Sequence, residues 1–136
     1  MAYPNATINE GGFGSFYNET GSTIALYTRC KFVSGTSPDG KPSLAVCANS
    51  ERGDVIAMAD IPTATYGQVR FLNAQGEQFG IVVAGAGGIA LAGDVYTDAN
   101  GQFSSNSGGG NLKVGKATIA GADTCPFTWI PLTPAA

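Results

Sequence analysis

Short stretches in which hydrophobic and polar residues alternate recur along this chain of 136 residues, separated by turns rich in glycine and proline. The clearest alternation covers residues 23–33. Apolar side chains from Ile24 to Phe32 share one face there, while Arg29 and Lys31 share the other. A period of two residues predicts a half-buried strand. Further strands are predicted for residues 43–48, 54–59, 66–72, 78–84, 89–91, 113–119 and 125–132.

Residues 92–104 have the pattern of a β-hairpin. Val95 and Thr97 fall on one face of its first strand, and Asn100 and Gly101 follow as a turn dipeptide. Such a pair supplies the two positive φ angles that a tight type I′ turn requires. The hairpin is therefore predicted to be part of the structural framework.

The spacing of these elements indicates an all-β fold, either a small β-barrel or a β-sandwich, formed by residues 22–136 as one domain. No segment has a convincing helical pattern. Residues 1–21 are rich in Asn, Gly and Thr and are predicted to form an extended N-terminal arm. Docking of the arm onto its own barrel and docking onto a neighbouring protein are equally compatible with its four aromatic residues, Tyr3, Phe13, Phe16 and Tyr17.

Charged residues make up only 12% of the chain, about half of the roughly 25% that is usual. Hydrophobic residues make up 43%. A surface with so little charge has weak protection against association, which favours contact with other subunits. The net charge is −3, and the seven Lys and Arg residues form no run, so nucleic-acid binding is disfavoured.

The chain has no histidine, which removes the usual general base and the commonest metal ligand. Residues 84–88 resemble a phosphate-binding glycine loop, but an expected strand follows them instead of a helix, so a plain turn is favoured. Asp94, Asp98 and Asn100 lack the spacing of a calcium loop, and a turn is favoured there too. A pair of carboxylates acting on a glycoside stays open, since such pairs form in space. We expect no enzymatic activity, no cofactor and no metal.

Three separated cysteines, Cys30, Cys47 and Cys125, form no CxxC motif, and buried free thiols are expected. A Cys30–Cys47 disulfide is the less favoured alternative. The chain shows neither a signal-peptide pattern nor an apolar run of about 18 residues. We therefore expect synthesis in the cytoplasm and no membrane partner.

The segments Gly93-Asp-Val-Tyr-Thr97, Asn100-Gly101 and Val114-Gly-Lys-Ala117, with the preceding strand Phe79-Gly-Ile-Val-Val83, resemble small β-barrel decoration (cement) proteins of tailed-phage capsids. The resemblance covers about the C-terminal half. It implies a homotrimer on the exterior of the virion, at three-fold positions of the expanded shell. It also implies that the major capsid protein is the partner and that the arm reaches it, with Tyr3, Phe13, Phe16 and Tyr17 as the contact residues.

A carbohydrate- or receptor-binding β module of a virion is the alternative function. Four aromatic residues of the expected strands, Tyr27, Tyr66, Phe127 and Trp129, are the candidates for a sugar-binding platform. Aromatic residues in strands more often serve as anchors of the core or of an interface. A capsid-stabilising role is therefore the favoured interpretation.

Overall fold

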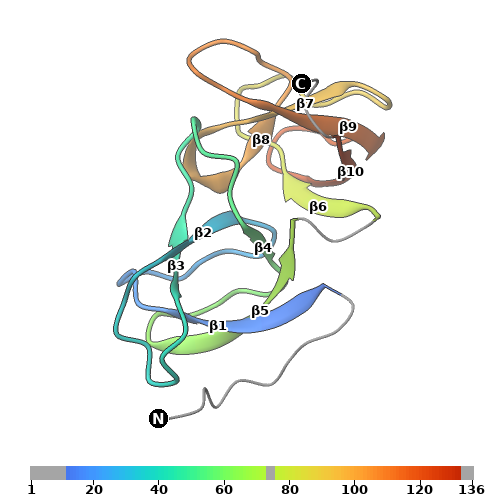
Figure 1. Cartoon of the computed structure of the whole chain (residues 1–136). Coiled ribbons are helices and arrows are strands. Elements are labelled where there is room, and N and C mark those ends of the chain that lie inside the picture. Colours follow the sequence, from blue (N-terminus) through green and yellow to red (C-terminus); the bar gives the residue numbers. More distant parts are fainter. Residues whose placement is uncertain (1–11, 73–75, 133–136) are drawn as a thin grey trace.

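The computed structural model describes residues 12–72 and 76–132. They form ten strands and one turn of 3-10 helix, with no α-helix among them, arranged as a closed barrel and a second sheet (Figure 1). The barrel strands are β1 (Phe13–Asn18), β2 (Arg29–Val33), β3 (Ser43–Val46), β4 (Val55–Ala57) and β5 (Thr65–Phe71). The second sheet consists of β6 (Gln78–Ile81), β7 (Asp94–Thr97), β8 (Phe103–Ser104), β9 (Lys113–Ile119) and β10 (Pro126–Pro131). This confirms the predicted all-β fold and its barrel.

The barrel has the strand order β1-β3-β2-β4-β5 and closes because β1 pairs with both β3 and β5. Its pairing with β5 is antiparallel and its pairing with β3 is parallel. Closure leaves no unpaired edge strand. The barrel core contains Phe16, Ile24, Cys30, Leu44, Val55, Ala57, Ile61 and Val69.

The second sheet has the order β6-β10-β9-β7-β8 and curls so that its two outer strands approach each other. Val82, just after β6, forms a parallel bridge with Phe103 of β8, and the amide of Val83 donates to the carbonyl of Phe103 at 2.8 Å. The sheet encloses a core of its own, made of Val82, Ile89, Val95, Phe103, Val114, Ala117, Phe127 and Trp129.

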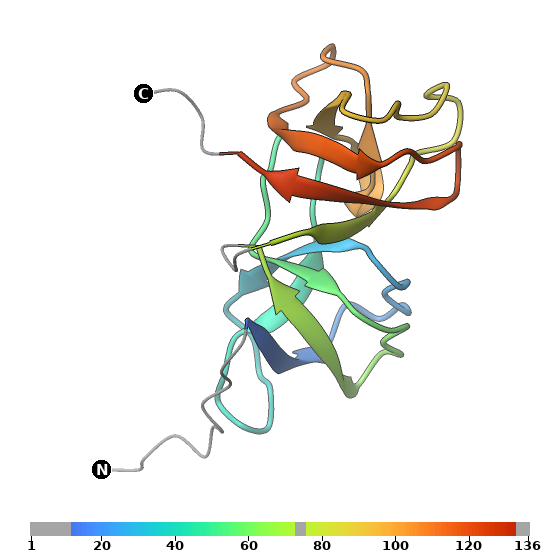
Figure 2. The same cartoon turned by 90° about the vertical axis from the view of Figure 1, so that its right-hand side faces the viewer.

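The barrel and the second sheet lie one above the other and are in contact (Figure 2). Ile56 of β4 is fully buried and belongs to the core of the second sheet. Tyr27, which precedes β2, stacks on Phe79 of β6 with ring centroids 4.7 Å apart. Burial of these apolar groups against the other half stabilises the arrangement of the two halves.

The predicted arm is wrong for residues 13–18, because they form barrel strand β1. Gly14, Phe16 and Asn18 point to the buried side of this strand, and Ser15 between them is exposed. The strand therefore has the expected period of two, but glycine and asparagine occupy two of its three inward positions. The earlier part of the predicted arm, residues 1–11, lies outside the described residues.

The predicted strand over residues 23–33 is shorter in the structure, where β2 begins only at Arg29. Ile24 makes a single bridge to Ile61, and Tyr27 has a φ of 66°, which interrupts an extended strand. The expected strand at residues 89–91 is likewise reduced to one bridge, between Ile89 and Gly121.

The predicted hairpin is confirmed. Asn100 and Gly101 have φ angles of 58° and 68°, and the amide of Gln102 donates to the carbonyl of Ala99 at 3.1 Å. This is the backbone of a type I′ turn. β9 also has the predicted bounds, and residues 84–88 form the predicted turn.

Candidate interaction surfaces

The three described aromatic residues of the predicted capsid-contacting set lie together on β1, and each has a partner within the chain. Phe16 is only 9% exposed, and its ring lies 4.6 Å from that of Phe32. Phe13 lies on the other face, beneath the guanidinium of Arg70 at 5.2 Å. Phe16 is therefore part of the barrel core. Tyr3, the fourth member, lies outside the described residues.

Tyr17 and Tyr66 form the aromatic pair on the outer face of the barrel, on neighbouring strands β1 and β5. Their ring centroids are 5.1 Å apart in an edge-to-face arrangement. The backbone amide of Asp39 donates to the Tyr66 hydroxyl at 3.1 Å. Since Tyr66 is 41% exposed, part of this pair is accessible to a partner.

The four aromatic residues considered for a sugar-binding platform do not come together. Phe127 and Trp129 are each 2% exposed, in the core of the second sheet. Tyr27 lies between the halves, stacked on Phe79. Only Tyr66 is exposed, and it lies on the barrel. These residues therefore form no shared exposed surface.

Arg29 is the least expected polar residue, because its strand pattern placed it on the solvent side and the structure buries it completely. Its guanidinium donates to four backbone carbonyls and, among the residues that the structure describes, meets no carboxylate at hydrogen-bond distance. The acceptors are Gln102 at 2.6 Å, Ala48 at 2.9 Å, and Asp98 and Glu51 at 3.1 Å each. These carbonyls belong to two loops, one from each half, so Arg29 links the barrel to the second sheet.

The environment of Arg29 depends on close packing around it. Its guanidinium lies 5.1 Å from the ring centroid of Phe103. A Cβ atom on Gly101 would lie 2.5 Å from the carbonyl oxygen of Arg29, and one on Gly53 would lie 2.7 Å from its Cγ. Burial lowers the pKa of the guanidinium from its ordinary value, although an arginine stays charged in proteins. No feature of the sequence around Arg29 marks it as buried.

Asp54, Asp60, Asp98 and Asp123 accept hydrogen bonds from backbone amides and so have structural roles. Asp123 accepts from the amides of Gly85 and Gly88 at 3.0 and 2.7 Å and so holds the glycine-rich turn. Asp60 and Asp54 accept from backbone amides, and Asp98 accepts from the amide that follows it. Within residues 12–72 and 76–132, no three acidic or cysteine side chains are grouped so that they could hold a metal ion.

Asp94 lies between two lysines of β9. Its Oδ1 is 2.9 Å from Nζ of Lys116 and 3.3 Å from Nζ of Lys113. Hydrogen bonds from these lysines lower the pKa of the Asp94 carboxyl. Asp94 was expected to lie in a turn, but it lies on β7, and its carboxylate connects β7 to β9 through these two lysines.

The cysteines are free, and the predicted burial holds for two of them. Burial raises the pKa of the Cys30 thiol to about 12 and that of the Cys47 thiol to about 11. Cys125 is exposed, so the prediction of a buried thiol is wrong there. It lies in the turn before β10.

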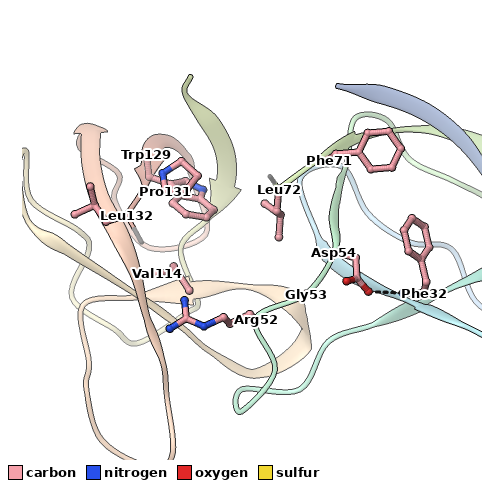
Figure 3. Close-up of a pocket in the computed structure, with 10 residues that line it drawn as sticks. All are labelled: Phe32, Arg52, Gly53, Asp54, Phe71, Leu72, Val114, Trp129, Pro131 and Leu132. Carbon is pink, nitrogen blue, oxygen red and sulfur yellow. Dashed lines mark hydrogen bonds between the residues drawn. The ribbon is translucent and has the colours of Figure 1, made fainter. Parts of the chain in front are cut away.

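A cleft of about 360 Å³ lies between the barrel and the second sheet (Figure 3). Its walls are mostly apolar. The barrel contributes Phe32, Gly53, Asp54, Phe71 and Leu72, and the second sheet contributes Val114, Trp129, Pro131 and Leu132, with Arg52 at the rim. No sequence pattern predicts this site, because its walls come from segments up to about 100 residues apart.

Arg52 differs from the other cations of the protein. Six of the seven make an ion pair, a hydrogen bond or a ring contact, namely Arg29, Lys31, Lys41, Arg70, Lys113 and Lys116. In the described part of the chain, Arg52 makes none. The carboxylate of Asp54, which also lines the cleft, accepts from the amide of Phe32 at 2.9 Å.

No helix in the described residues combines the length and the apolar character that crossing a membrane requires. No model of a known protein family matches the chain, and no curated protein matches it. Among solved structures, the N base of the head fiber gp8.5 of bacteriophage phi29 is similar, with a TM-score of 0.68 at 16% identity. The match covers 88% of this chain and 94% of the phage chain. The two proteins therefore share a fold over nearly their whole lengths.

Proposed function

We propose that this protein is a structural component of a phage virion that decorates the capsid and stabilises it by bridging neighbouring capsid subunits. The observation that carries the proposal is the shared fold with the phi29 head fiber base over 88% of the chain. The hairpin and strand motifs that resemble capsid decoration proteins also support a role in the virion.

The composition and the fold support a passive binding role. A charged fraction of 12% keeps the electrostatic cost of association low. The barrel is closed, so its strands have no open edge for further pairing. Contacts with a shell would therefore use side-chain surfaces and the segment before β1, including Tyr3. The proposed partner is the major capsid protein, the proposed location is the exterior of the virion, and the proposed assembly is a homotrimer.

Binding to capsids tests this function directly. The purified chain is mixed with expanded, DNA-free capsids of the phage that encodes it, and the shells are then sedimented and heated. We expect co-sedimentation at a fixed stoichiometry and a higher temperature of shell opening, since bridging adds interface that must be broken. Shells that neither bind the chain nor gain heat resistance would exclude the decoration role.

A carbohydrate- or receptor-binding module is the second candidate, favoured by the exposed Tyr66 beside Tyr17. A glycan array separates the two functions. If the chain binds a sugar, loses that binding in Tyr66→Ala and does not bind capsids, the protein is a carbohydrate-binding module and not a decoration protein. The oligomeric state follows from light scattering, for which the monomer mass is 13.8 kDa.

A further inference from the structure

We propose that the cleft between the barrel and the second sheet is the binding site for the N-terminal segment of the same chain, residues 1–11. The proposal rests on the walls of the cleft, on the position at which the segment enters the barrel and on charge. It concerns the protein before it meets a capsid, when the segment that the proposed function assigns to the shell, including Tyr3, can occupy the cleft. It therefore goes beyond the proposed capsid function and does not depend on it.

The cleft has the surface of a binding site for an extended segment with apolar side chains. Phe71 and Leu72 form one wall and Pro131 and Leu132 form part of the other (Figure 3). Leu132 is 44% exposed. The volume of the cleft, about 360 Å³, is within the roughly 300–1,000 Å³ range of small binding pockets. Covering these walls would remove apolar surface from water.

The N-terminal segment joins the barrel beside this cleft. Phe13 pairs with Arg70, and the carbonyl of Gly12 accepts from the amide of Phe71 at 2.7 Å. Because β1 and β5 are antiparallel, the described chain begins, at Gly12, beside Phe71 and one residue from Leu72. Phe71 and Leu72 both line the cleft. Eleven residues can reach at most about 40 Å, which allows the segment to follow the cleft from this point.

The composition of the segment complements the site. Residues 1–11 include the apolar residues Met1, Tyr3, Pro4 and Ile8, and Glu10 is their single charged residue. At the rim of the cleft, Arg52 has no partner in the described part of the chain. Glu10 lies two residues before Gly12, and its carboxylate is the proposed partner of Arg52. Attachment to the barrel gives the segment a high effective concentration at this site, which favours its own cleft over that of a second copy.

A charge exchange in the full chain tests the proposal. The variants are Arg52→Glu, Glu10→Arg and the double variant. The control is Lys113→Glu, which changes the net charge by the same amount as Arg52→Glu. Lys113 lies on the face of β9 opposite to Val114, which lines the cleft. The measurement is the {¹H}–¹⁵N heteronuclear NOE of the Ile8 amide, which reports motion on the picosecond to nanosecond scale. We expect a high value in the wild type and in Lys113→Glu, a loss in each single cleft variant, and recovery in the double variant.

The apolar contact needs its own variant, because one exposed ion pair is weak. Leu132→Ser removes part of the wall at a half-exposed position and should also lower the Ile8 NOE. A low wild-type NOE, or values that no cleft variant changes, would overturn the proposal. So would a high NOE that falls on dilution while light scattering shows dissociation, since the occupant would then be the segment of a second copy.

Discussion

At the scale of single residues, the buried Arg29 is the most consequential side chain. Its four carbonyl acceptors come from loops of both halves. A buried donor group that satisfies several acceptors is costly to remove, because each acceptor is then left without a partner in a poorly solvated site.

Replacement of Arg29 by methionine, which has similar length and no donors, should therefore be strongly destabilising. We expect the free energy of unfolding to fall by roughly 3 kcal/mol or more, measured by urea denaturation. Lys113→Met removes an exposed ion pair and serves as the control, with an expected change below about 1 kcal/mol. Equal effects of the two substitutions would contradict the assigned role of Arg29.

The buried thiols predict a dependence of stability on alkaline pH. Burial raises the pKa of Cys30 to about 12 and that of Cys47 to about 11, compared with an ordinary value of 9.0. Above pH 9 the unfolded chain loses these protons while the folded chain keeps them, so the stability present below pH 9 declines as the pH rises towards 11 and 12. Urea denaturation between pH 8 and 11 measures the decline.

The matched variant for this prediction is Cys47→Ala. Its stability should fall less steeply above pH 9 than that of the wild type, since one of the two raised pKa values is gone. Parallel slopes for the two proteins would show that other groups, such as tyrosines and lysines, cause the decline.

At the scale of elements, β1 is a strand of the barrel although glycine, serine and asparagine make up half of it. Phe16 packs against Phe32 and Phe71, with ring centroids 4.6 and 6.0 Å away. Phe16→Ala should lower the free energy of unfolding by about 3–5 kcal/mol, the usual cost for a core phenylalanine. Ser15→Ala, at the exposed position next to it, should change it by less than about 0.5 kcal/mol. If the denaturation curves of both variants match that of the wild type, β1 is dispensable to the barrel.

The hairpin turn between β7 and β8 also allows a test, because only one of its two central positions is crowded. Gly101 has a positive φ, and an added Cβ would lie 2.5 Å from the carbonyl oxygen of Arg29. Gly101→Ala should destabilise the protein by about 2 kcal/mol or more in chemical denaturation. Asn100→Ala places alanine at the other positive φ, at an exposed position, and should cost only about 1 kcal/mol. Similar losses for both substitutions would indicate that turn conformation alone, and not contact with Arg29, sets the requirement.

At the scale of the whole molecule, the contacts between the barrel and the second sheet predict that the two halves unfold together. Ile56 of the barrel lies in the core of the second sheet, and Tyr27 stacks on Phe79 across the two halves. Trp129 is the single tryptophan and lies in the second sheet, so its fluorescence reports that half, whereas far-ultraviolet circular dichroism reports both.

We therefore expect the fluorescence and circular dichroism curves of the wild type to coincide in urea, as for a two-state transition. In Arg29→Met, with the link between the loops removed, the two curves should separate. Separate curves already in the wild type would show that the halves are independent domains.

Several features of this protein were predictable from the sequence because they depend on local chemistry. The period-two patterns gave the all-β class, and Asn100-Gly101 gave the type I′ turn, because few residue pairs accept two positive φ angles. Two predictions from the pattern were wrong. β1 was predicted to be part of an arm, because glycine and asparagine occupy two of its inward positions. Arg29 was predicted to face solvent, because an arginine at a strand position ordinarily does so.

The tertiary structure alone decided the burial of Arg29, the closure of the barrel through β1 and the position of the cleft. Each of these depends on residues far apart in the sequence. Arg29 is separated by 73 residues from its acceptor Gln102, and the cleft brings Phe32 opposite Leu132. Alternation along a strand shows which side chains share a face, but it does not show what covers that face. The partners of a face are set by chain topology, and for that reason the strands were visible in the sequence while the interaction surfaces were not.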